Sequence, residues 1–146
     1  MNMIFRRFSS DDRQACCALF DANCPDFFLP NERADYVAFL DAAPEFYEVC
    51  VDGANIVGAF GLAIDDDTRG TLCWIMIDPS VQGKGIGKSI MARILAAGRD
   101  QRLSVIRIAA SHKSAPFFAN FGAEAMVTTR DGWGPGMDRI DMQLPV

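Results

Sequence analysis

Hydrophobic and polar residues alternate along the chain with two different periods, and the changes of period predict the order of the elements. Short stretches rich in β-branched and aromatic residues are bounded by turn residues, as is typical of strands. Longer stretches carry apolar residues at intervals of three and four, which is typical of helices with one buried face. The predicted strands are 3–8, 46–51, 55–64, 71–77, 104–109, 125–129 and 139–144, and the predicted helices follow Ser9–Asp12 and span 31–42, 86–99 and 114–121.

This order of elements predicts an α+β domain with a mixed sheet. Residues 71–77 are almost continuously apolar, which predicts a central strand covered on both faces. The sequence contains no internal repeat, no low-complexity tract and no linker rich in Pro, Gly or Ser. Because 146 residues is an ordinary size for one domain, we expect residues 1–146 to form a single domain.

Composition and charge exclude several classes of protein. Half of the residues are hydrophobic and 23% are charged, so the chain can bury a substantial core. A net charge of −5 disfavours a general nucleic-acid binder. No apolar run is long enough to span a membrane, and the first residues do not resemble a signal peptide. We therefore expect a cytoplasmic protein with neither a nucleic-acid nor a membrane partner.

The cysteines and the single histidine indicate neither a disulfide scaffold nor a metal site. Five cysteines are an odd number, and none of them forms a Cys-x-x-Cys spacing. His112 is the only histidine, so a structural zinc site lacks its usual ligands. Reduced and mostly buried thiols without a metal are the expectation.

A glycine-rich loop at residues 78–89 carries the clearest chemical signal. A predicted strand leads into this loop, and the loop opens directly into a predicted helix. Backbone N–H groups in such a loop, together with the partial positive charge of the helix N-terminus, suit an anionic phosphate. Two of the three lysines of this acidic chain, Lys84 and Lys88, lie in the loop. This placement predicts a local anion-binding site.

Three phosphate-binding patterns compete for the loop. A Walker A loop requires its first glycine where Gln82 stands, and a dinucleotide-binding GxGxxG requires glycine where Lys88 or Ile90 stands. The pattern Gln/Arg-x-x-Gly-x-Gly/Ala, in contrast, is matched completely by Gln82, Gly85 and Gly87.

With this pattern the chain resembles the GNAT superfamily of N-acetyltransferases, whose pyrophosphate-binding motif for acetyl-CoA has this form. The segment Ala-Pro-Phe-Phe-Ala-Asn-Phe-Gly-Ala at 115–123 is similar to the later family motif A-x-F-Y-x-x-x-G-F. The resemblance implies a GNAT-like α+β (α/β) fold, with a mixed, mostly antiparallel sheet of six to seven strands and about four flanking helices. The fourth and fifth strands, 72–77 and 105–109, are expected to splay apart around acetyl-CoA.

The resemblance also implies which residues contact this cosubstrate. Backbone groups of the fourth strand would pair with the pantetheine arm, and one N–H would polarise the thioester carbonyl as an oxyanion hole does. N–H groups of the loop would hold the pyrophosphate. The implied contact residues are Ile75, Met76, Ile77, Gln82, Gly83, Lys84, Gly85, Ile86, Gly87, Lys88, Ser111, Phe117 and Phe118.

The sequence departs from the family at the general acid, because the usual tyrosine corresponds here to Phe118. Three explanations stay open: the thiol leaves without help, a proton arrives through water from Ser111, Ser114 or His112, or transfer is inefficient. Ser111 is the candidate that we carry forward as acid.

The general base is equally open. Family members often use a carboxylate near the fourth strand, and Glu32 and the run 65–67 are candidates, with a solvated turn favoured for the run. The expected function is transfer of acetyl from acetyl-CoA to a primary amine by direct attack in a ternary complex. The alternative is a non-catalytic acyl-CoA-binding regulatory or sensor module. The expected partner is a small-molecule or peptide amine, and a homodimer stays open.

Overall fold

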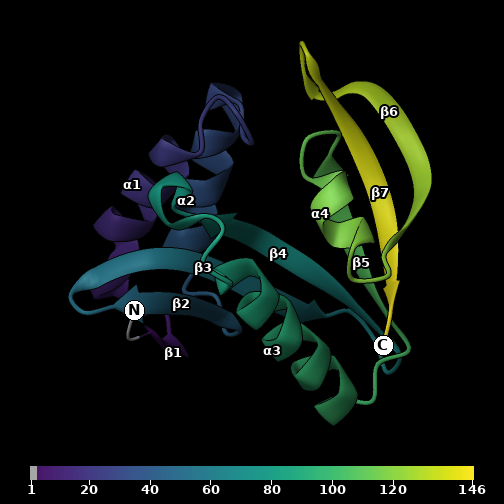
Figure 1. Ribbon diagram of the computed structural model, residues 1–146, viewed down its shortest axis with the longest axis horizontal. Coiled ribbons are helices and arrows are strands. Elements are labelled where there is room, and N and C mark those ends of the chain that lie inside the picture. The colour runs from purple at the N-terminus through teal and green to yellow at the C-terminus, as the bar shows by residue number, and fades with distance from the viewer. Residues whose placement is uncertain (1–2) are drawn as a thin grey trace. The chain divides into compact units, whose positions relative to one another are not determined.

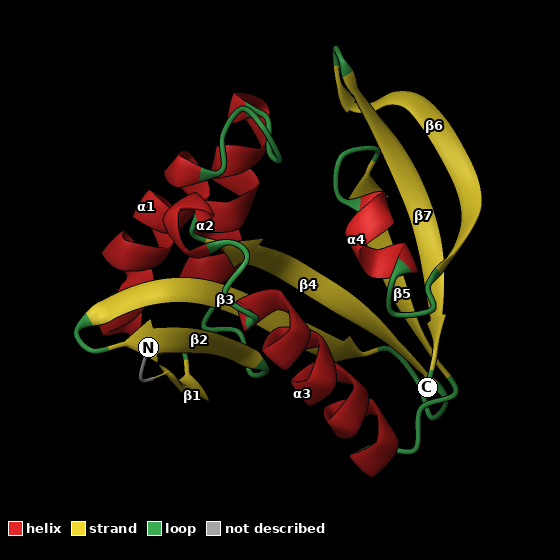
Figure 2. Ribbon diagram, in the orientation of Figure 1, coloured by secondary structure: helices red, strands yellow, loops and turns green. Residues whose placement is uncertain are grey.

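A computed structural model describes residues 3–146 of the chain. Within them, seven strands alternate with four α-helices and three short 3₁₀ turns (Figures 1 and 2). None of these helices is both long and apolar enough to cross a lipid bilayer. The elements are β1 (Met3–Arg7), α1 (Arg13–Ala22), α2 (Arg33–Asp41), β2 (Tyr47–Asp52), β3 (Asn55–Ile64), β4 (Arg69–Ile77), α3 (Ile86–Asp100), β5 (Val105–Ser111), α4 (Ala115–Ala119), β6 (Glu124–Gly134) and β7 (Met137–Pro145).

The strands form one mixed sheet in the order β1-β2-β3-β4-β5-β7-β6. Neighbours β1/β2, β2/β3, β5/β7 and β6/β7 are antiparallel, whereas β4 and β5 are parallel and pair Arg69–Thr71 with Val105–Arg107. The predicted α+β fold, with a mixed sheet of six to seven strands and about four helices, is therefore confirmed. The splaying of β4 and β5 stays a prediction.

The chain forms two compact units, which are described separately. The first unit contains Met1–Gly61 and Cys73–Ile90, and the second contains Leu62–Leu72 and Met91–Val146. The expectation of a single domain over residues 1–146 stays a prediction.

The first unit buries one face of each of its two helices. α1 follows Ser9–Asp12, as predicted, and the Ser9 N–H donates to Asp12 Oδ2 at 2.9 Å before the helix begins. The second helix begins at Arg33, after a 3₁₀ turn, rather than at residue 31. The core joins apolar side chains of both helices to those of β2, β3 and β4: Cys16, Cys17, Leu19, Phe20, Tyr36, Leu40, Tyr47, Val49, Val51, Ala59 and Met76.

Residues 71–77 lie in β4, the central strand of the sheet, as predicted, but the strand is covered only in part. Only Leu72 and Met76 are buried in this stretch, and the other five side chains are half-buried. The backbone explains part of the difference, because Trp74 has a φ of 41° and interrupts the regular alternation of faces.

In the second unit, β5 alternates between buried and exposed side chains. Ile106, Ile108 and Ala110 are buried, while Arg107 and Ala109 between them are exposed. This alternation has the period of two that a strand with one covered face requires. The other buried apolar residues of this unit are Leu62, Leu72, Met91, Ile94, Leu103, Ala115, Phe118, Ala123, Met137, Met142 and Leu144.

The last two strands extend much farther than the sequence predicts (Figure 1). Residues 130–138, which join the two predicted strands and are rich in Gly and Pro, are mostly part of a hairpin, in which Gly134 pairs with Met137. Two hydrogen bonds of 2.9 Å close it: the Asp131 N–H donates to Asp138 Oδ1, and the Gly136 N–H donates to Asp131 Oδ1. The glycines serve the turn itself, because Gly136 has a φ of 80°.

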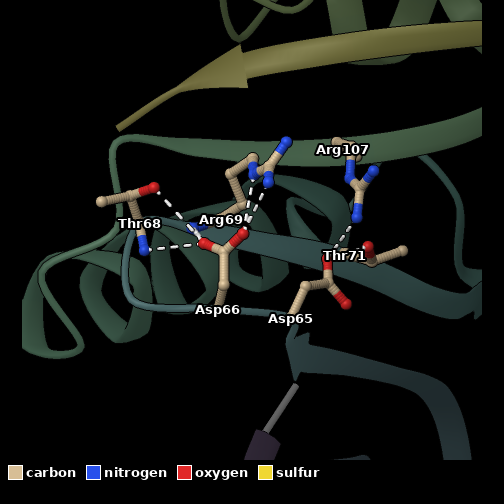
Figure 3. A network of polar contacts seen from close by, with 6 residues as sticks. All are labelled: Asp65, Asp66, Thr68, Arg69, Thr71 and Arg107. Atoms are coloured by element: carbon tan, nitrogen blue, oxygen red, sulfur yellow. Dashed lines mark hydrogen bonds and ion pairs between the residues drawn. The ribbon is translucent and has the colours of Figure 1, made fainter.

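A single carboxylate bridges the parallel strands β4 and β5. Asp65 Oδ2 accepts a hydrogen bond from Thr71 Oγ1 at 2.6 Å and from Arg107 Nη2 at 2.9 Å (Figure 3). Thr71 and Arg107 are opposite each other in the register of the two strands. The Asp65 side chain therefore ties the two strands together within the second unit.

Candidate active site

The glycine loop between β4 and α3 has a backbone that only glycine adopts freely. Gly83 has a φ of 82° and Gly85 a φ of 83°, both in the left-handed region. A Cβ added at either position would meet no atom within 4 Å, and the residues from Gln82 to Gly85 are exposed. Sterics within the chain therefore do not demand these glycines. The backbone conformation demands them, and it leaves the loop open to a ligand.

The first turn of α3 places backbone N–H donors next to this loop. The Ser89 N–H donates to the Gly85 carbonyl at 3.0 Å, which makes Gly85 the residue at which helical bonding starts. The N–H groups of Ile86, Gly87 and Lys88 precede the first helical hydrogen bond, and the helix dipole adds partial positive charge there. Ile86 is buried and anchors the helix, while Lys84 and Lys88 are exposed.

Two polar side chains fix the end of β4, where the loop begins. The buried Asn23 donates through Nδ2 to the Leu19 carbonyl at 2.9 Å and to the Ile77 carbonyl at 3.0 Å. Asp78 accepts the Ser80 N–H at 2.9 Å. These contacts join β4 to the C-terminal end of α1 and shape the first turn of the loop.

An aromatic cluster surrounds Trp74 of β4. Its indole ring lies 5.1 Å from the ring of Tyr36, 5.9 Å from Phe28 and 6.4 Å from Phe39, measured between centroids. Phe28, Phe39 and Trp74 are half-buried. These rings come from three separate segments of the chain, so no local sequence pattern connects them as one cluster.

A chain of hydrogen bonds reaches the backbone of β4 at the same residue. Tyr47 Oη donates to the Trp74 carbonyl at 2.7 Å, and Tyr36 Oη lies 2.9 Å from Tyr47 Oη. Burial is the largest cause that raises the pKa of both tyrosines, so both stay protonated throughout the working range of pH. A left-handed φ at a residue as large as Trp74 costs about 1–3 kcal/mol and is concentrated at functional sites.

Glu32, the candidate base, lies at the start of α2 and is buried. Its Oε2 accepts the Leu29 N–H at 2.8 Å, so the side chain also closes the turn before the helix. Burial raises its pKa, and the Leu29 hydrogen bond opposes the rise. A carboxylate with a raised pKa is a stronger proton acceptor than an ordinary one.

Asp65 and Asp66, in the acidic run 65–67, are weaker candidates for the base. The pKa of Asp65 is lowered by its hydrogen bonds from Thr71 and Arg107. The pKa of Asp66 is lowered to about 2 by the Thr68 N–H and by Arg69, whose Nε donates at 2.8 Å (Figure 3). These interactions favour the charged carboxylates and weaken them as proton acceptors, which agrees with the favoured reading of a turn.

The candidate acids lie in the second unit, where β5 ends. Ser111 is buried, and its Oγ accepts the N–H groups of Lys113 and Ser114, each at 3.2 Å, so it shapes the turn before α4. Ser114 Oγ is 3.3 Å from Ser111 Oγ. His112 is exposed, and its Nδ1 accepts the Asp138 N–H at 3.1 Å.

Two phenylalanines of α4 pack edge to face, with centroids 5.1 Å apart. Phe118 is buried, with 3% of its surface exposed, and Phe117 is half-buried. The position at which the resembled family has tyrosine is therefore part of the apolar core of the second unit.

The predicted site residues are distributed over both units. Residues 75–77, 82–88 and Glu32 belong to the first unit, whereas Ser111, Phe117 and Phe118 belong to the second. Their roles stay predictions. Within residues 3–146, no group of three or more His, Cys, Asp and Glu side chains is arranged to hold a metal ion.

The family to which these features point is the acetyltransferase (GNAT) family, whose model matches residues 16–123. The chain belongs to this family, which confirms the resemblance derived from the two motifs.

Solved structures with low sequence identity share the fold over nearly the whole chain. Ard1 from Thermoplasma volcanium is 15% identical with a TM-score of 0.84, covering 100% of this chain and 99% of its own. The ribosomal-protein-S18-alanine N-acetyltransferase from Escherichia coli is 16% identical with a TM-score of 0.81, covering 99% and 94%. N-acetylglutamate synthase from Neisseria gonorrhoeae, solved with coenzyme A and N-acetyl-glutamate, is 15% identical with a TM-score of 0.75, covering 99% of this chain and 35% of its own.

Proposed function

We propose that this chain is an acetyl-CoA-dependent N-acetyltransferase that transfers the acetyl group to a primary amine by direct attack in a ternary complex. The observation that carries the proposal is the loop from Gln82 to Lys88, with two left-handed glycines and open space at the N-terminus of α3. Membership of the acetyltransferase family and the coenzyme A complex of a structural neighbour support the same assignment.

In this proposal, the first unit binds and polarises the cosubstrate. The backbone N–H groups from Gly83 to Lys88 hold the pyrophosphate, with Lys84 and Lys88 adding long-range attraction. Backbone groups of Ile75, Met76 and Ile77 align the pantetheine arm. One N–H of this strand donates to the thioester oxygen, where negative charge develops during attack.

Proton transfer divides into two steps with different demands. An amine with a pKa near ~10 must lose a proton before it attacks, and Glu32 is the carboxylate whose raised pKa suits that role, directly or through water. The coenzyme A thiol has a pKa near ~8.5, so its thiolate departs with little help. Ser111 or water then supplies the final proton.

The acceptor amine is proposed to be a small molecule or a peptide. We assign the choice of acceptor to the segments Cys24–Asp35 and Asp131–Asp138, because both contain aromatic and acidic side chains that tolerate a cation. All five cysteines are free of disulfides, which fits a reaction in the reducing cytoplasm.

A non-catalytic acyl-CoA-binding module is the second candidate, and Phe118 is the observation that favours it. The side chain at this position is buried and has no proton to donate. Both candidates bind acetyl-CoA, and only the enzyme releases its thiol.

The deciding experiment has two stages. Calorimetry with acetyl-CoA measures binding, and a thiol-release assay over a panel of peptide N-termini, polyamines, amino sugars and lysine peptides measures turnover. Binding with amine-dependent thiol release supports the enzyme. Binding without release for every amine supports the second candidate, and absence of binding contradicts both.

A further inference from the structure

The strongest unexplained feature of the first unit is the pair of buried tyrosines that ends on the backbone of β4. Tyr36 and Tyr47 are the only tyrosines of the chain, and both have less than 2% of their surface exposed. They come from α2 and β2, and their hydroxyl groups form a chain: Tyr36 Oη contacts Tyr47 Oη, and Tyr47 Oη contacts the Trp74 carbonyl. A packing role alone does not require this arrangement, because phenylalanine would fill the same volume.

The direction of each hydrogen bond in this chain is fixed. A carbonyl oxygen only accepts, so Tyr47 commits its single proton to Trp74. The hydrogen bond between the two hydroxyls must then run from Tyr36 to Tyr47. Donors arranged in series polarise one another, which strengthens the final bond to the Trp74 carbonyl.

The consequence for the neighbouring donor follows from the planar peptide. The Trp74 carbonyl and the Ile75 N–H belong to one trans peptide unit and point in opposite directions. A hydrogen bond of 2.7 Å that holds the carbonyl toward the core therefore directs the Ile75 N–H away from Tyr47. Withdrawal of electron density by the tyrosine also makes this N–H a better donor.

The backbone at this point needs such support. Trp74 has a φ of 41°, a conformation that a bulky L-residue does not hold without help from its surroundings. Tyr47 is itself held rigidly, since its ring packs 5.0 Å from Phe39 and 5.9 Å from Phe8. An alanine Cβ at Gly61, opposite Tyr47 in the sheet register, would lie 2.8 Å from Tyr47 Cδ1, so this glycine makes room for the ring.

We infer that Tyr47, assisted by Tyr36, is a positioning residue that aims and polarises the Ile75 N–H as the donor to the thioester carbonyl of acetyl-CoA. This inference rests on the proposed function. That proposal gives polarisation of the thioester to one N–H of β4, and the inference assigns this role to the N–H of Ile75.

The test is the carbonyl stretching band of bound acetyl-CoA labelled with ¹³C at the thioester, measured by difference infrared spectroscopy. In the natural protein the band is expected below its frequency in water, because a directed donor polarises the bond. Tyr47→Phe removes only the hydroxyl group and should move the band most of the way back to its frequency in water. Tyr36→Phe should move the band back by a smaller amount. The dissociation constant of acetyl-CoA should change less than about twofold, because the pyrophosphate loop supplies most of the affinity.

Kinetics with an amine from the panel gives the second readout. Tyr47→Phe should lower kcat about tenfold with little change in the KM for acetyl-CoA, a smaller loss than the ~100-fold expected for complete removal of an oxyanion donor. The ratio between natural and variant kcat should be equal at pH 7 and pH 9, because a positioning hydroxyl does not titrate there. A ratio that changes with pH would overturn the positioning role in favour of proton transfer.

Val49→Ala is the matched control, because it removes apolar volume from the same strand two residues away. It should lower the melting temperature while leaving the infrared band and kcat unchanged. If Tyr47→Phe does not fold, the shift in Tyr36→Phe decides alone. An unchanged band in the tyrosine variants, with acetyl-CoA bound normally, refutes this inference and leaves the proposed function standing. Failure of the natural protein to bind acetyl-CoA refutes both.

Discussion

Replacement of Gly85 by alanine separates the chemistry of the glycine loop from its backbone strain. Gly85 has a φ of 83°, and an alanine there costs roughly 1–2 kcal/mol, because its Cβ approaches the following carbonyl oxygen. Nothing within the chain lies within 4 Å of the added methyl group, so no steric term is added in the free protein. The expected loss of stability is therefore small, a few degrees in melting temperature for a chain of this length.

The same substitution should affect acetyl-CoA binding much more strongly. The methyl group occupies the open side of the loop, where the pyrophosphate must approach the backbone N–H groups closely. Loss or lengthening of one or two such hydrogen bonds should raise the dissociation constant at least about tenfold, which corresponds to about 1.4 kcal/mol. Calorimetry measures this change, and thermal unfolding followed by circular dichroism measures the change in stability.

Gly53 provides a matched control. It has a φ of 62° in the turn between β2 and β3, and a Cβ there also meets nothing within 4 Å. Gly53→Ala should cost a similar amount of stability and leave acetyl-CoA affinity unchanged.

A second substitution, Gly85→Asn, distinguishes strain from obstruction, since asparagine tolerates the left-handed region but carries a larger side chain. It should restore stability and weaken binding further. Unchanged affinity in both Gly85 variants would refute the placement of the pyrophosphate.

Three further predictions concern charge and the missing acid. Lys84→Ala and Lys88→Ala should each weaken acetyl-CoA binding modestly and reduce its salt dependence in calorimetry, whereas complete loss of binding would rank the side chains above the backbone. Asp12→Asn should cost about 1 kcal/mol at pH 7 in urea unfolding, allowing for the partial exposure of Arg6. The Arg6 hydrogen bonds lower the folded pKa of Asp12, so this contribution is complete above the unfolded pKa and is lost as the pH falls through the folded one. Phe118→Tyr should leave kcat similar or slightly higher, and a rise of ~100-fold or more would show that the natural chain lacks its acid and favour the non-catalytic candidate.

The glycine loop was predictable because its signal is local. A strand, a turn and a helix N-terminus follow one another within twelve residues, and the spacing of Gln82, Gly85 and Gly87 reports that order directly. The pattern does not state what each glycine does. Gly83, which is outside the pattern, has a left-handed φ like that of Gly85, whereas Gly87 does not. A motif thus locates the loop, and the backbone explains it.

The aromatic and tyrosine contacts of β4 were not predictable, because they join residues far apart in the sequence. Tyr36, Tyr47 and Trp74 lie on a helix and two strands that are not neighbours in the sheet. The apolar run 71–77 gave no sign of the left-handed residue at its centre, since tryptophan is common in regular strands. The length of the last two strands was underestimated for a different reason. Glycines that close a tight hairpin turn cannot be told by composition from glycines of a longer loop.

The donor that we propose at Ile75 and the phenylalanine at position 118 concern the same reaction barrier. Acyl transfer needs stabilisation of the developing oxyanion and departure of the thiol. A thiolate departs readily near neutral pH, so an acid contributes less here than it would for an alkoxide. Polarisation of the thioester, in contrast, needs a donor that is fixed at the oxygen on which negative charge develops. Both tyrosines of the chain lie behind the peptide group of Trp74 and Ile75, and none is at position 118. In the inferred mechanism their hydroxyl groups therefore assist polarisation of the thioester, which is the harder of the two steps.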